Sequence, residues 1–215
     1  MSPNGGLWIV CDWCIIVLMN KILLKIKTFF RTLTKELVPT TISATAGGLA
    51  ICLGTYASRV CEEPILSPLL FAVGIFVVMV FNLGLITRFT PTHSFTSFNL
   101  ARLVIILVVN LITANLMGSL ANFSATPPDN LFWWSVLGGV VIGLVSLNHM
   151  LTTPYKVSLA LLLMYIFVML GLPHCVVYAF LGADFPTLMT VVAGNLVGGV
   201  ALNFGFRYIC SHNKK

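Results

Sequence analysis

Charged residues are scarce in this chain. Only 8% of its 215 residues are charged, and just six of them are acidic, whereas a soluble domain carries about 25% charged residues. Hydrophobic residues make up 58% of the chain, and the mean hydropathy is +1.00. This shortage of charge excludes an ordinary soluble domain and predicts an integral membrane protein in contact with the lipid bilayer.

The chain also lacks any long polar segment in which a separate soluble domain would fold. Because a transmembrane helix needs about 20 apolar residues, six spans are predicted. They lie at about 40–58, 65–87, 103–121, 131–148, 158–180 and 187–206. Short breaks that contain proline and charged residues separate the spans. The predicted fold is therefore an all-α membrane bundle, with a segment 1–38 before it and a tail 209–215 after it.

Basic residues are nearly absent from one side of the predicted bundle. If residue 1 is cytoplasmic, eleven lysines and arginines lie on the cytoplasmic side and only Arg59 lies outside. This distribution follows the positive-inside rule, so both termini are expected to be cytoplasmic and the protein to lie in the cell membrane. The net charge of +6 thus reflects topology and anionic lipid, and no nucleic acid partner is expected.

The segment before the first predicted span is amphipathic. Between residues 22 and 37, apolar side chains recur at helical spacing, and five basic residues from Lys21 to Lys35 lie elsewhere on the helical wheel. This pattern is typical of a helix that lies on the inner membrane face. The alternative is a seventh span over residues 7–26, which would move the N-terminus outside.

Three short matches, in the same order, indicate an internal repeat. GGLAI at 47–51 matches GGVVI at 138–142, GLIT at 84–87 matches GLPH at 171–174, and ANLMGSL at 114–120 matches GNLVGGV at 194–200. A unit of three spans reverses its orientation when it is repeated. The halves 39–123 and 129–208 would therefore form an inverted repeat, which in transporters places the substrate site at the repeat interface.

His174 is a titratable residue within the fifth predicted span, and this alignment pairs it with Thr87 in the second. The segments that follow, 88–95 and 173–186, are poor continuous helix. Broken helices occur at membrane depth only where they are buried or line a cavity, and their N-termini would direct N–H groups toward a small anion. The alternatives are a core histidine bonded to a neighbouring helix and a threonine bonded to its own helix.

These motifs resemble those of the formate/nitrite transporter family. The resemblance rests on LIT at 85–87, NLMG at 115–118, GLPH at 171–174, NLVGG at 195–199 and the basic N-terminal segment, and it extends from about residue 20 to 210. It implies an aquaporin-like fold with broken second and fifth spans. It also implies a homopentamer, in which each protomer has a pore for small monovalent anions such as formate, nitrite, hydrosulfide, acetate or lactate.

The resemblance also implies roles for individual residues. His174 would be the central histidine of the pore, with Thr87 beside it, and it would pair with the anion or donate a proton to it. Two hydrophobic constrictions would flank this pair and exclude hydrated ions. The inner constriction would comprise Leu85 and Ile86 with Ile75, the outer one Phe71 and Phe167 with Val145, and the supporting residues would be Asn115, Asn195, Gly118 and Gly198. Ordinary helix packing is the alternative for each apolar residue.

The sequence departs from the family pattern and from other six-span classes. The family's lysine near the start of the fourth span is missing from residues 129–139. No Gly-x-Ser-Gly motif is present, so an intramembrane serine protease or other enzyme is not expected. Proline follows neither Asn115 nor Asn195, which argues against an aquaporin, although a channel for small neutral solutes stays the alternative. No cofactor and no metal site are expected.

Overall fold

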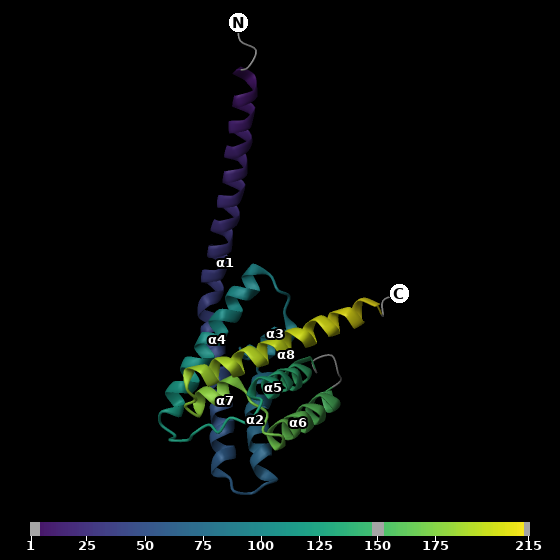
Figure 1. Ribbon diagram of the computed structural model, residues 1–215. Helices are drawn as coiled ribbons and strands as arrows, with labels where there is room; N and C mark the ends of the chain where they lie inside the picture. The colour runs from purple at the N-terminus through teal and green to yellow at the C-terminus, as the bar shows by residue number, and fades with distance from the viewer. Residues whose placement is uncertain (1–4, 148–152, 213–215) are drawn as a thin grey trace. The chain divides into compact units, whose positions relative to one another are not determined.

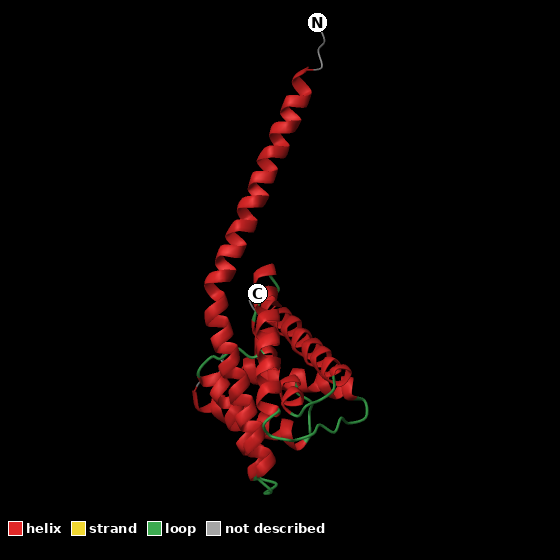
Figure 2. Ribbon diagram, turned by 90° about the vertical axis from the view of Figure 1, so that its left-hand side faces the viewer, coloured by secondary structure: helices red, strands yellow, loops and turns green. Residues whose placement is uncertain are grey.

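The computed structural model describes residues 5–147 and 153–212. All regular structure in these residues is helical (Figure 2). The chain divides into two compact units, Met1–Pro39 and Thr40–Lys215. Helix α1 (Gly5–Val60) begins in the first unit and ends in the second, with Pro39 inside it. The first unit is thus helical from residue 5 onward, and its position on the inner membrane face stays a prediction.

The second unit contains the remaining helices. They are α2 (Leu66–Val80), α3 (Ile86–Thr92), α4 (Ser97–Gly118), α5 (Leu131–Leu147), α6 (Thr153–Met169), α7 (Cys175–Phe180) and α8 (Phe185–His212). Three helical stretches of the described chain, Val17–Val60, Ser97–Gly118 and Phe185–Ile209, are long and apolar enough to cross a membrane. Two other predicted spans each consist of two helices, α2 with α3 and α6 with α7. The protein therefore has an all-helical membrane fold in which the second and fifth spans are broken.

The two breaks have the same backbone conformation. Leu85, just before α3, has φ −126° and ψ 131°, and His174, just before α7, has φ −124° and ψ 129°. Three residues earlier, Asn82 has φ 55° and Gly171 has φ 61°. Asparagine and glycine are the residues that most readily adopt this left-handed conformation. The two breaks are therefore equivalent, as expected for an inverted repeat.

This equivalence corrects the predicted pairing of the two middle spans. The backbone pairs His174 with Leu85, not with Thr87. The sequence match aligned Gly84 with Gly171, but the residue that takes the left-handed conformation of Gly171 is Asn82. A match of glycine to glycine therefore moved the predicted register by two residues.

Each short helix packs against helices of the other half of the chain. Helix α3 contacts α5 and α8, whereas α7 contacts α4. The longer parts of the two broken spans, α2 and α6, pack against each other (Figure 1). Because both breaks lie among helices of both halves, the residues at the breaks meet at the interface between the repeats.

Candidate functional site

Asn195 satisfies the free backbone groups at the second break. Its side-chain oxygen accepts a hydrogen bond from the backbone N–H of Cys175, at 2.9 Å. Its side-chain nitrogen donates to the carbonyl of Ser135 at 2.7 Å and to that of Pro173 at 2.9 Å. Only 1% of Asn195 is exposed. One buried amide thus joins α8, α5 and the start of α7.

Asn110 makes the same three bonds at the first break. Its oxygen accepts from the N–H of Ile86 at 3.0 Å, and its nitrogen donates to the carbonyls of Ala44 at 2.7 Å and Gly84 at 3.1 Å. The first N–H of each short helix is therefore bonded to an asparagine. The sequence predicts that the N–H groups at these helix starts point toward a small anion. In the structure, the first N–H of each short helix is bonded to an asparagine side chain instead.

The structure corrects the predicted position of the first supporting asparagine. Asn115 is exposed on α4, and the residue that bonds the first break is Asn110. Residues 110–111 and 195–196 share the dipeptide Asn-Leu, so the sequence held the correct match. The longer similarity around residues 114–120 placed the register five residues too late.

A third buried asparagine, which sequence reasoning missed, holds the far end of α3. Asn203 on α8 donates to the carbonyls of Thr90 at 2.7 Å and His93 at 2.9 Å. The Nε of Arg207 donates to its side-chain oxygen. Asn203 follows Asn195 by eight residues, about two helical turns, so both lie on one face of α8. This spacing from Asn195 is the feature of the sequence that could have identified Asn203 as a second supporting residue on α8.

His174 lies at the second break and contacts the first half of the chain. A hydrogen bond of 3.0 Å joins its Nε2 to the Oγ1 of Thr87. The histidine is fully buried, with 0% of its surface exposed, and its Nδ1 has no hydrogen-bond partner among the described residues. The two residues chosen from the sequence therefore meet directly, although they are not symmetry mates.

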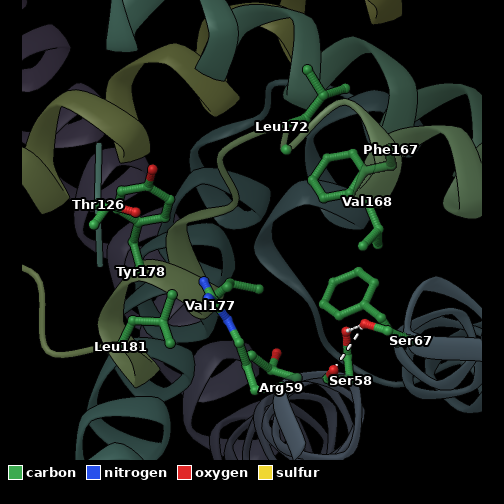
Figure 3. Close-up of a pocket in the computed structure, with 13 residues that line it drawn as sticks. Ser58, Arg59, Ser67, Thr126, Phe167, Val168, Leu172, Val177, Tyr178 and Leu181 are labelled. Atoms are coloured by element: carbon green, nitrogen blue, oxygen red, sulfur yellow. Dashed lines mark hydrogen bonds between the residues drawn. The ribbon is translucent and has the colours of Figure 1, made fainter. Parts of the chain in front are cut away.

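A stacked pair of phenylalanines contacts this histidine through one of its two rings. The rings of Phe71 on α2 and Phe167 on α6 are stacked, with centroids 6.0 Å apart and an angle of 6° between their planes. The ring of Phe167 also packs edge-on against His174, at 6.3 Å. Both phenylalanines line a cavity of about 380 Å³ (Figure 3). The ring pair therefore lies between the cavity, which both rings line, and His174, which Phe167 contacts.

The other predicted constriction residues are buried. Leu85 and Ile86 lie at the start of α3, Ile75 on α2 and Val145 on α5, and at most 2% of each is exposed. Their lining of a pore stays a prediction. The two predicted supporting glycines, Gly118 and Gly198, lie where backbones approach closely, because an added Cβ would overlap the carbonyl oxygen of Phe180 or Val136, respectively.

Replacing Gly198 with alanine is expected to lower the thermal unfolding temperature of the purified protein. The methyl group would overlap the backbone of α5, and overpacking a tight contact costs about 1–3 kcal/mol. Gly205→Ala, on the same helix, is the control because an added Cβ there meets no atom within 4 Å. Equal unfolding temperatures for the two variants would contradict the close packing of α5 and α8.

Comparisons with known proteins agree with this fold. No protein-family model matches the sequence, and no curated protein matches it. One similar solved structure is described as an FNT family ion channel, with a TM-score of 0.63, 16% identity and coverage of 82% of this chain and 90% of that chain. Another is a pentameric formate channel with formate bound, with a TM-score of 0.62, 14% identity and coverage of 84% and 98%. The predicted fold class is thus confirmed.

Proposed function

We propose that the protein is a membrane channel of the formate/nitrite transporter type, which passes small monovalent anions such as formate, nitrite or hydrosulfide. The observation that carries the proposal is the buried ring of His174, whose Nδ1 has no partner among the described residues. A buried polar atom normally has a hydrogen-bond partner, so an unbonded one at a helix break suits a transient ligand. The fold shared with a formate channel supports the same assignment.

Thr87 prepares the histidine ring for this role. When its hydroxyl donates to Nε2, the proton of a neutral imidazole is on Nδ1, because only one ring nitrogen of the neutral form carries hydrogen. Nδ1–H is then a donor for an anion. When the ring is protonated, both nitrogens donate, and Thr87 accepts from Nε2. In either state the hydrogen bond of 3.0 Å fixes the plane of the ring.

The chemistry at His174 offsets the free energy that an anion loses when it leaves water. An unpaired charge in an apolar constriction is strongly unfavourable, and the flanking phenylalanines offer no polar group. A protonated ring pairs with the anion directly. Alternatively, the protonated ring gives its Nδ1 proton to the anion and becomes neutral, the resulting neutral acid passes the apolar residues, and the ring then takes up a proton from the aqueous phase.

The proposal is tested by flux through the purified protein in liposomes. We expect formate, nitrite and hydrosulfide to cross faster than in protein-free liposomes, with rates that depend on pH between about 5 and 8, because passage by either route uses a proton on the ring of His174. Lactate measures the width of the pore. Protein-free liposomes correct for undissociated acid that crosses the lipid. A folded protein that accelerates none of the four would remove the proposal.

Shortening the stacked phenylalanines is expected to widen the pore. In Phe71→Ala and Phe167→Ala, the apolar barrier beside the cavity is lost, so lactate flux should rise relative to formate flux. Phe185→Ala is the matched control because that side chain is 73% exposed at the start of α8. An unchanged ratio of lactate to formate in both variants would mean that this ring pair does not limit passage.

We also propose that the protein is a homopentamer in the cell membrane, with both termini in the cytoplasm. The support is the pentameric formate channel that shares this fold and the confinement of basic residues to one predicted side. Light scattering in detergent, corrected for bound detergent, should give five times the chain mass of 23.4 kDa. A monomer that still transports anions would contradict the pentamer and leave the channel in place.

A further inference from the structure

The cavity beside the phenylalanine pair has one charged residue in its lining. The described residues around it come from α1, α2, α6, α7 and three loops, and Arg59 is the one residue among them that is charged at neutral pH. Figure 3 shows its side chain, on α1, among the other residues that line the cavity. A cavity with one arginine in its wall attracts an anion before the anion reaches the apolar rings.

The guanidinium of Arg59 is not neutralised within the described chain. No carboxylate of the described residues forms an ion pair with it. Glu62 and Glu63 follow closely in sequence, but both are exposed and neither lines the cavity. The positive charge and the five N–H donors of the arginine therefore stay available to a molecule in the cavity.

The hydroxyl groups of the cavity wall fall into two sets. Ser58 and Ser67 bond each other at 2.9 Å, and Thr55 bonds the carbonyl of Ile51 at 2.8 Å. The hydroxyls of Tyr178 and Thr126, which also line the cavity, have no hydrogen-bond partner within the described chain. Two free hydroxyls thus accompany the free guanidinium.

We propose that Arg59 is the capture residue of the cavity and that it selects planar anions with two oxygen atoms, namely short carboxylates and nitrite. This inference rests on the proposed channel function and names the substrate class for that site. The parallel N–H groups of a guanidinium match the two oxygens of such an anion. Hydrosulfide, with a single sulfur atom, uses the charge of Arg59 but not its fork.

The capture site precedes the barrier in the order of the structure. Phe167 lines the cavity and also contacts the ring of His174, so an anion held by Arg59 is separated from the histidine by the stacked rings. Arg59 therefore acts on the concentration at which the channel saturates. The barrier and His174 act on the limiting rate.

The test measures the initial flux of formate and of hydrosulfide against concentration in proteoliposomes. In Arg59→Gln we expect the half-saturating concentration of formate to rise about tenfold, as for the loss of a charged hydrogen bond, with an unchanged limiting rate. Arg59→Lys keeps the charge and loses the fork. Arg59→Lys should therefore transport hydrosulfide at the wild-type level. Its formate flux should lie between that of Arg59→Gln and that of the wild type.

Glu62→Gln is the matched control because it changes a nearby exposed charge outside the cavity lining. It should leave both half-saturating concentrations within about twofold of wild type. Wild-type saturation by formate in Arg59→Gln would overturn the capture role, and full restoration of formate by lysine would overturn the selection of planar anions. Both results leave the channel standing. Absence of flux in the wild-type protein removes the channel and this inference together.

Discussion

His174→Asn is expected to lower the limiting rate of formate flux by about tenfold or more and to remove its dependence on pH. The ring supplies a hydrogen bond to the anion, and bonds to charged groups contribute about 1.5–3 kcal/mol, which corresponds to about ten- to a hundredfold in rate. Asparagine is similar in size but does not titrate. The measurement is the initial formate flux in proteoliposomes from about pH 5 to 8.

Two further variants separate this role from general damage to the fold. His212→Asn changes an exposed histidine in the last turn of α8 and should transport as the wild type does. Thr87→Val removes the partner of Nε2 and keeps the shape of the side chain. It should reduce flux less than His174→Asn does. An unchanged rate and pH profile in folded His174→Asn would rule out any direct action of the ring on the anion.

Asn195→Ala and Asn110→Ala are expected to destabilise the protein more than any other single change described here. Each replacement removes three hydrogen bonds at a buried break, and each buried polar group left without a partner costs about 1–3 kcal/mol. The break would then close or refold. We expect a large fall in the thermal unfolding temperature, measured in detergent, and a lower yield of the oligomer.

Asn115→Ala is the matched control because Asn115 lies on the same helix as Asn110 but is exposed. Its unfolding temperature should stay close to that of the wild type, as is usual for surface substitutions. If Asn110→Ala unfolds at the same temperature as Asn115→Ala, the hydrogen bonds at the first break do not hold the fold together.

The sequence was sufficient to predict the membrane class and the broken spans, because both follow from the distribution of apolar residues and helix-breaking residues. It also aligned the first span of each half correctly. Gly47 lies against the carbonyl of Gly84, and Gly138 lies against that of Pro173, just before each short helix. At both sites a side chain would displace the break, so the same residue type is required at equivalent positions.

The register of the other spans was wrong for a physical reason. Asparagine and glycine both adopt a left-handed conformation, so Asn82 and Gly171 are equivalent in backbone but differ in sequence. Small residues recur along α4 and α8 because helices pack closely there. A match of such residues is therefore compatible with several registers, and only the hydrogen bonds of Asn110 and Asn195 distinguish them.

The cavity and its arginine were beyond reach of a reading along the chain. The lining residues come from four helices and three loops, and none of them stands out in its own segment of the sequence. From the sequence, Arg59 was predicted only to be the one basic residue on the outer side of the membrane. The family resemblance implied that Thr87 lies beside His174, and the two residues are in direct contact. Only their predicted symmetry pairing was wrong, since the backbone pairs His174 with Leu85.

The most direct test of the account compares formate and glycerol permeability in the same proteoliposomes at one pH. Protein-free liposomes provide the background for both solutes. An anion channel with a histidine at its centre should accelerate formate and leave glycerol at the background rate. Acceleration of glycerol without formate would contradict the account and identify a channel for neutral solutes built on the same fold.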